Sequence, residues 1–220
     1  MKNTLPPSHD LELHESFYSL FRQTPSLSNS MRRLRTLILF VSCCLLAASQ
    51  FSSAQETLVG LTSNGGPGGK GTAFSIKTNG TEFTIVKGFA DWGKNPNGGL
   101  VQGADGSYYG MTYGGGTFNN YGTIFKITSA GVVTVLRQLN YAADGGYPYG
   151  DLTLGVDGNF YGLTSGGGTN TYGTIFKITP TGTFTVLRHF NYAADGANPQ
   201  GTLVLAADGN FYGITRRGGT

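Results

Sequence analysis

A tandem repeat with a period of about 51 residues is the feature that most limits what this chain can fold into. The phrase Gly-Thr-(Ala/Ile)-Phe-(Ser/Lys)-Ile recurs at intervals of 51 residues, starting at Gly71, Gly122 and Gly173. The phrase Asp-Gly-(Ser/Asn)-(Tyr/Phe)-Tyr-Gly recurs at intervals of 52 and 51 residues, starting at Asp105, Asp157 and Asp208. Asn-Tyr-Ala-Ala-Asp-Gly recurs after 51 residues, starting at Asn140 and Asn191. Because the three phrases share one period, each repeat is expected to be one structural unit that packs on its neighbours.

Each repeat is predicted to contain two β-hairpins in series. In the copy at 151–201, alternating and β-branched residues predict strands at 152–156, 159–164, 174–179 and 183–190. Asp157-Gly158 predicts a two-residue type I′ turn, and a second turn is expected at 180–182. The glycine-rich segment 165–172 reads as a flexible loop between the hairpins. The unit is therefore predicted to be a four-stranded antiparallel meander.

Apolar residues fall on both faces of the later strands, with Val133 and Val135 on one side and Val132 and Leu136 on the other. A sheet with two apolar faces must be covered on both, which stacked β-propeller blades achieve. The predicted fold is therefore all-β and β-propeller-like, and a β-solenoid is the alternative. The units are expected near 57–98, 99–150, 151–201 and 202–220.

The number of predicted strands corresponds to about three and a half blades. Closed propellers typically have about four to eight blades, so this segment makes an incomplete ring. The chain is expected to be a fragment of a longer protein, and closure of the ring between chains of an oligomer is the alternative.

The first 54 residues differ in character from the rest of the chain. Residues 31–54 combine an Arg-rich start, a short apolar run at 36–48 and small residues before Gln55, which together predict a secretory signal peptide. An uncleaved anchor and a lipoprotein anchored at Cys43 or Cys44 are alternatives. Residues 1–30 are either an extended leader or lie upstream of a true start at Met31. The prediction is an exported protein, extracellular or at the cell surface, whose mature part is the repeat region 55–220.

Charge and composition argue against several function classes. Residues 55–220 carry ten Lys/Arg and nine Asp/Glu without a basic cluster beyond Arg216-Arg217, which argues against a nucleic-acid partner. His189 is the single histidine of this region, and no nucleophile or orienting carboxylate can be assigned to it. The recurring Asp105, Asp157 and Asp208 are predicted to form turns. No catalytic residue, metal site or cofactor is expected.

The loops between repeats carry the candidate ligand-binding residues. Aromatic side chains recur there and could stack on a sugar or anchor a partner protein, although local packing over the edge of a sheet is the alternative. The loop aspartates are less obviously needed for a turn. The candidates are Trp92, Tyr141, Asp144, Tyr192 and Asp195.

The Asp-Gly-Asn-Phe-Tyr-Gly-Leu-Thr phrase, the Gly-Gly-Gly loop and Gly-Thr-Ile-Phe-Lys-Ile together resemble the GloVer tandem-repeat family of bacterial exported proteins, over residues ~57–220. The resemblance implies a surface or secreted location, often with a C-terminal sorting anchor, and no established enzymatic activity. Membrane attachment would come through the signal peptide or such an anchor. The expected function is a binding or adhesion scaffold for a glycan or surface protein. The alternatives are a non-catalytic propeller in a larger polysaccharide-active enzyme and a structural spacer.

Overall fold

The computed structural model describes residues 57–117 and 120–220. The predicted leader at 1–30 and the predicted signal peptide at 31–54 lie outside the described residues. Within the described ranges all thirteen elements are β-strands, which confirms the all-β prediction. No helix in this part of the chain is long and apolar enough to cross a membrane.

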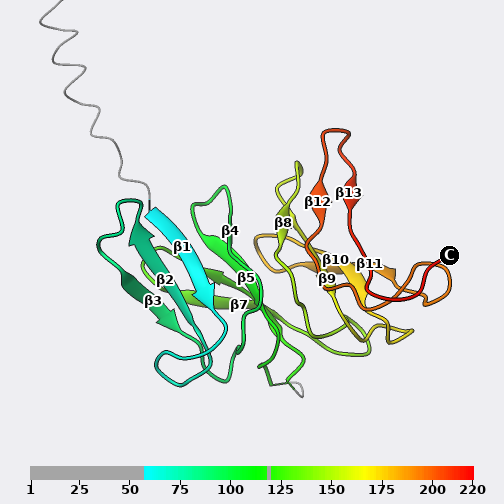
Figure 1. Cartoon of the computed structure of the whole chain (residues 1–220), viewed down its shortest axis with the longest axis horizontal. Helices are drawn as coiled ribbons and strands as arrows, with labels where there is room; N and C mark the ends of the chain where they lie inside the picture. The colour runs from blue at the N-terminus through cyan, green and yellow to red at the C-terminus, as the bar shows by residue number, and fades with distance from the viewer. Residues whose placement is uncertain (1–56, 118–119) are drawn as a thin grey trace, which may run out of the picture. The chain divides into compact units, whose positions relative to one another are not determined.

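The strands form antiparallel sheets in which neighbours in sequence are neighbours in space (Figure 1). The first sheet has β1 (Thr57–Thr62), β2 (Thr72–Lys77) and β3 (Thr84–Gly88). The second has β4 (Val101–Gln102), β5 (Tyr108–Thr112), β6 (Thr123–Ile127) and β7 (Val133–Gln138). The third has β8 (Thr153–Leu154), β9 (Phe160–Thr164), β10 (Thr174–Ile178) and β11 (Phe184–His189), and the last has β12 (Val204–Leu205) and β13 (Phe211–Tyr212). The predicted four-stranded meander is thus present in the second and third sheets.

The tight hairpins in these sheets have three-residue loops, so the predicted two-residue type I′ turn at Asp157-Gly158 is wrong. Gly155 N–H donates to the carbonyl of Asn159 at 2.8 Å, and Gly158 N–H donates to the carbonyl of Gly155 at 3.0 Å. Within this loop only Gly158 has a positive φ, 74°, whereas a type I′ turn needs two such residues. The loop is a type I turn followed by a glycine in the left-handed region. The predicted turn at 180–182 has the same pattern, with Gly182 N–H bonded to the carbonyl of Thr179.

Two repeated cross-strand contacts explain the phrases that define the repeat. In each of the first three sheets a glycine lies opposite a phenylalanine of the next strand. The pairs are Gly60–Phe74, Gly110–Phe125 and Gly162–Phe176. A Cβ at Gly162 would collide with the Phe176 ring, so the glycine makes room for the aromatic side chain. The strand-end threonines share a hydroxyl hydrogen bond of about 3 Å in the pairs Thr62–Thr72, Thr112–Thr123 and Thr164–Thr174.

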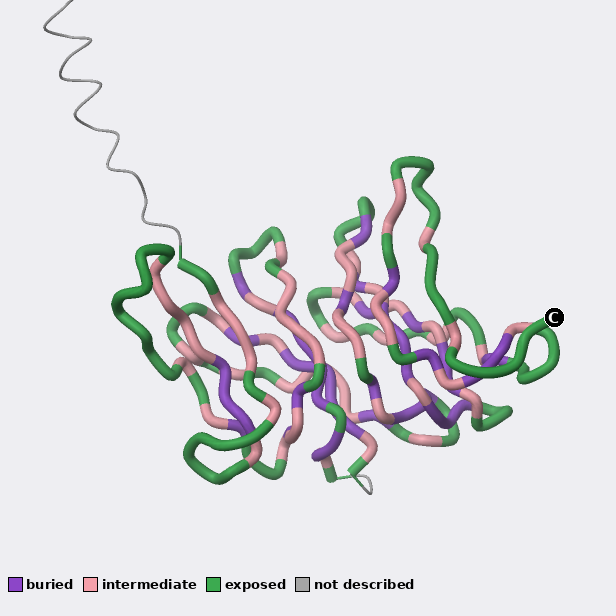
Figure 2. Tube along the Cα trace, viewed as in Figure 1, coloured by how far each residue is buried: buried purple, intermediate pink, exposed green. Residues whose placement is uncertain are grey.

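Consecutive sheets pack face to face through three apolar clusters (Figure 2). The central cluster joins the second and third sheets around Tyr109, Ile124, Phe160 and Phe176. Val133 packs in the cluster toward the first sheet, whereas Leu136 packs in the central one. The prediction that the second sheet has two covered faces is therefore confirmed, but the assignment of Val132 to one of them is wrong, because Val132 precedes β7 in the hairpin and is exposed.

Antiparallel order places the two kinds of connection at opposite ends of the strands. The three-residue hairpins lie at one end, and the glycine-rich loops and the segments that lead to the next sheet lie at the other (Figure 1). We call the latter the long-loop edge: residues 63–71, 89–100, 113–122 without 118–119, 139–152, 165–173, 190–203 and 213–220. This edge carries all five candidate residues.

Candidate functional site

Hydrogen bonds between neighbouring repeats make the long-loop edge one continuous structure. Gly146 and Gly166 exchange two backbone hydrogen bonds of 2.8 and 3.1 Å across a repeat boundary. Lys94 and Gly114 make the same exchange at the preceding boundary, at 2.9 and 3.1 Å. Loops from different repeats are therefore held in register with one another.

The Asn-Tyr-Ala-Ala-Asp-Gly phrase folds into a single capped turn of helical type. Asp144 N–H donates to the carbonyl of Asn140 at 2.7 Å, and the Asn140 side-chain oxygen accepts from the N–H groups of Ala142 and Ala143 at 3.1 Å. This is the capping that asparagine provides at the start of a helical turn. Asp195 and Asn191 repeat the arrangement one unit later.

The two candidate aspartates, Asp144 and Asp195, hold these turns in place. Arg137 Nε and Nη2 donate to the Asp144 carboxylate at 3.0 and 2.7 Å, and Asn140 N–H donates to it at 3.0 Å. Arg188 makes the same bidentate contact with Asp195. The Arg188 guanidinium keeps the pKa of Asp195 below its ordinary value. Both carboxylates thus face an arginine of their own repeat, and a binding role for them stays a prediction.

We expect Asp144→Ala to lower the free energy of unfolding by about 2 kcal/mol, because three hydrogen bonds to a buried carboxylate are lost. The Asp144 side chain is 5% exposed and that of Asp195 is 19% exposed. Asp195→Ala is the matched control and should cost clearly less, because water solvates the more exposed pair better. Urea denaturation measures both variants. Equal losses would show that burial does not set the strength of this contact.

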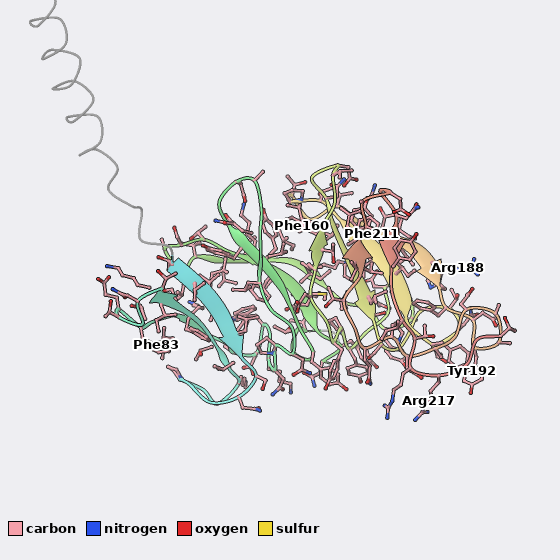
Figure 3. All side chains as sticks on the ribbon, turned by 45° about the horizontal axis from the view of Figure 1, so that its top comes forward. Phe83, Phe160, Arg188, Tyr192, Phe211 and Arg217 are labelled. Carbon is pink, nitrogen blue, oxygen red and sulfur yellow. The ribbon has the colours of Figure 1, made fainter. Side chains whose placement is uncertain are left out.

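The structure separates the three aromatic candidates from one another. Trp92 is half-buried and packs on Phe89 and Phe125, with ring centroids 5.0 and 5.7 Å apart. Tyr192 is 48% exposed, packs on Tyr172 at 5.5 Å and lies on the outside of the molecule (Figure 3). Tyr141 contacts neither of the other two candidates and belongs instead to a larger group of tyrosines.

That group is the tyrosine cluster, formed by Tyr113, Tyr121, Tyr141, Tyr147 and Tyr149. Its ring centroids are 4.8 Å apart for Tyr121–Tyr141, 5.1 Å for Tyr113–Tyr147 and 5.5 Å for Tyr121–Tyr147. Sequence reasoning found only Tyr141. A signal for the rest was present, because Gly-Tyr-Pro-Tyr at 146–149 departs from the Asn-Pro-Asn and Asn-Pro-Gln of the other repeats.

Tyrosine hydroxyls in the described ranges fall into two groups. Those of Tyr109, Tyr161 and Tyr212 donate to the turn aspartates Asp105, Asp157 and Asp208 at 2.7–2.9 Å. The tyrosine cluster has no hydroxyl hydrogen bond to another described residue, and no buried polar side-chain atom there lacks a partner. The cluster hydroxyls therefore face water. Burial, and after it the neighbouring tyrosines, raise the pKa of the Tyr147 hydroxyl above its ordinary value.

The turn aspartates have the structural role that the sequence predicted. Asp157 accepts the N–H of Asn159 at 3.1 Å, and Asp105 also pairs with Lys126 at 2.6 Å. The hydrogen bond from Lys126 lowers the pKa of Asp105 to about 2. His189 accepts the N–H of Thr169 through Nδ1 at 3.2 Å. Among the described residues no group of three or more His, Cys, Asp or Glu is placed to hold a metal ion.

Comparison with known proteins agrees with the repeat pattern. The family model described as the Gloeobacter/Verrucomicrobia repeat matches residues 47–220, which confirms the resemblance to the GloVer repeats. The search of curated proteins finds no match.

Proposed function

The chain belongs to the Gloeobacter/Verrucomicrobia repeat family, and we propose that it is an exported binding scaffold whose long-loop edge engages an extracellular ligand. In this proposal the sheets are β-propeller-like blades. Each blade would supply one glycine loop and one segment leading to the next blade.

Packing between consecutive sheets supports the blade arrangement. Tyr109 of β5 stacks on Phe160 of β9 at 4.1 Å, and Tyr161 of β9 lies 4.3 Å from Phe211 of β13. The same pair of repeat positions thus joins the second sheet to the third and the third to the last. A contact that repeats with the sequence gives each blade the same relation to the next.

The tyrosine cluster carries the binding proposal. Tyrosine offers a large apolar ring and a polar end, and it loses little conformational entropy when a ligand immobilises it. Here the rings are held together, the hydroxyls have no partner in the described residues, and the turn at 140–144 is fixed by the Arg137–Asp144 pair. A preorganised surface of this kind binds at a lower entropic cost.

The contacts of the acidic side chains favour a binding function over a hydrolytic one. Every Asp and Glu among the described residues is engaged with a lysine, an arginine, an amide or a backbone N–H. Glycoside hydrolysis needs two carboxyl groups that face each other across a substrate at about 5–10 Å. In this proposal the described repeats therefore bind, and catalysis is not assigned to them.

The test exposes the full chain to a glycan array and to solubilised cell-envelope proteins. We expect saturable binding to a member of one panel, weakened about tenfold or more by Tyr141→Ala, since a tenfold change corresponds to about 1.4 kcal/mol. Tyr212→Ala is the matched control, because Tyr212 is an exposed tyrosine of strand β13 outside the tyrosine cluster. No binding to either panel would count against the scaffold and favour the spacer. Binding lost in Tyr212→Ala but kept in Tyr141→Ala would assign it to another surface.

A further inference from the structure

Building on the proposed function, we propose that Tyr113, Tyr147 and Tyr149 form a subsite for the pyranose rings of an uncharged polysaccharide. The three residues belong to the outer part of the tyrosine cluster. Tyr113 follows strand β5, and Tyr147 and Tyr149 flank Pro148 in the segment that leads to the next sheet.

The repeat at 99–150, here called the middle repeat, lacks a hydrogen bond that the repeats on either side of it make at the corresponding positions. Asn95 donates from its side-chain amide to the Ser63 carbonyl at 3.2 Å, and Asn198 donates to the Ser165 carbonyl at 2.8 Å. The middle repeat has Tyr147 where the others have asparagine and Tyr113 where they have serine. A Tyr113–Tyr147 ring contact at 5.1 Å replaces the amide hydrogen bond.

Tyrosine in place of asparagine at position 147 is unfavourable for the backbone conformation. Asn95, Tyr147 and Asn198 share a left-handed conformation, with φ of 52°, 57° and 54°. Asparagine tolerates this region well, whereas a bulky aromatic residue is an outlier there. Strained residues of this kind persist at functional sites, where the conformation serves a ligand. Compared with asparagine at this position, Tyr147 lacks the side-chain hydrogen bond and raises the energetic cost of the left-handed conformation. In exchange it adds an aromatic ring to the surface.

The shape and chemistry of that surface fit a sugar. Tyr113 is 36% exposed and Tyr149 is 42% exposed. Their rings meet edge to face at 88° with centroids 6.2 Å apart, while Tyr113 and Tyr147 are inclined by only 30°. The C–H face of a pyranose packs on an aromatic ring, and the sugar hydroxyls can exchange hydrogen bonds with tyrosine hydroxyls. In this proposal one exposed ring packs on the face of the sugar and the ring set at an angle to it contacts the edge of the sugar.

Charge favours a neutral ligand. The cation–π contacts of the described residues involve Tyr109 and Phe184 rather than the tyrosine cluster. One cationic side chain, that of Lys94, lies beside Gly114, the residue that follows Tyr113. Sulfated or uronic acid polymers are recognised by arginine and lysine, because these supply charge-assisted hydrogen bonds. A single lysine beside three tyrosines supplies little of that chemistry, so the inferred ligand carries no charge.

The test is affinity electrophoresis of the full chain in gels that contain hydroxyethyl cellulose, xylan, laminarin or polygalacturonate. We expect at least one of the three neutral polymers to retard the chain and polygalacturonate to leave its mobility unchanged. The decisive variant is Tyr113→Ser/Tyr147→Asn, which restores the serine and asparagine of the neighbouring repeats. We expect its dissociation constant to rise at least tenfold, while its melting temperature stays the same or increases.

Two further variants keep the result interpretable. Tyr149→Ala removes an exposed ring without touching the left-handed position, and should weaken retardation by several-fold. Tyr212→Ala removes an exposed tyrosine of strand β13, outside the tyrosine cluster and the long-loop edge, and should retain binding within about twofold. Unchanged retardation in Tyr113→Ser/Tyr147→Asn and Tyr149→Ala would overturn the subsite, as would retardation by polygalacturonate alone.

The outcomes separate this inference from the proposed function. If the chain binds a cell-envelope protein but no neutral polymer, the sugar subsite is wrong and the scaffold remains. If the chain binds no polymer and no protein, both proposals fail.

Discussion

Replacing Phe160 with alanine is expected to lower the free energy of unfolding by about 3–5 kcal/mol, because a large aromatic side chain is removed from a closed core. Phe160 is fully buried, stacks on Tyr109 at 4.1 Å and lies in the central cluster between the second and third sheets (Figure 3). Its removal leaves a cavity between two sheets rather than within one. The loss is measured as a shift of the urea midpoint with the slope unchanged.

Phe211 is the control for that substitution, because it occupies the same position one repeat later and packs on Tyr161 at 4.3 Å. It is only half-buried, so Phe211→Ala should cost roughly 1–2 kcal/mol. A similar loss for both variants would contradict the explanation that the full burial of Phe160 sets its larger contribution to stability.

Replacing Gly173 with alanine is the second large effect, with an expected loss of about 2–4 kcal/mol. Gly173 begins the Gly-Thr-Ile-Phe phrase, has φ of 101°, and a Cβ there would overlap the Thr164 carbonyl oxygen. Because the obstacle is backbone of the paired strand, neither side can move aside easily. Thermal unfolding followed by circular dichroism measures the change.

Gly158→Ala isolates the conformational part of this effect. Gly158 has φ of 74°, but nothing lies within 4 Å of where its Cβ would be. We expect a loss of about 1 kcal/mol, the cost of placing a non-glycine residue in the left-handed region. If Gly173→Ala proved no more harmful than Gly158→Ala, the close approach to Thr164 would not be what requires glycine in the phrase.

Much of the fold could be predicted from the repeat, because each phrase encodes contacts between strands that are close in sequence. The Asp-Gly turns, the Gly–Phe pairs and the Thr–Thr pairs all lie within one unit, so their spacing identifies them. The type of turn was predicted incorrectly at Asp157-Gly158. Asp-Gly fits both a two-residue and a three-residue loop, and only the backbone hydrogen bond between Gly155 and Asn159 distinguishes them.

The candidate site was harder to predict, for a physical reason. Asp144 and Asp195 were proposed as ligand-binding because no turn in the sequence requires them, yet their partners Arg137 and Arg188 lie seven residues earlier on a strand. Tyr141 was identified as an isolated loop aromatic. Its companions Tyr113 and Tyr121 come from the preceding loop at 113–122, and Tyr147 lies six residues after Tyr141 in its own segment. A hydrogen bond from Tyr147 N–H to the carbonyl of Tyr121 joins the two segments.

The sequence by itself determined the repeat, the antiparallel hairpins within it and the family, since these depend on period and on contacts between neighbouring strands. Only the tertiary structure decided which polar groups are internally satisfied and which are presented to solvent. The hydroxyl of Tyr161 bonds to Asp157 within its own hairpin, whereas the packing of loop segments gathers Tyr113, Tyr147 and Tyr149, whose hydroxyls bond to no other described residue. The same residue type thus stabilises a hairpin at one position and contributes an unpaired hydroxyl to the loop surface at another, according to the groups that the fold places beside it.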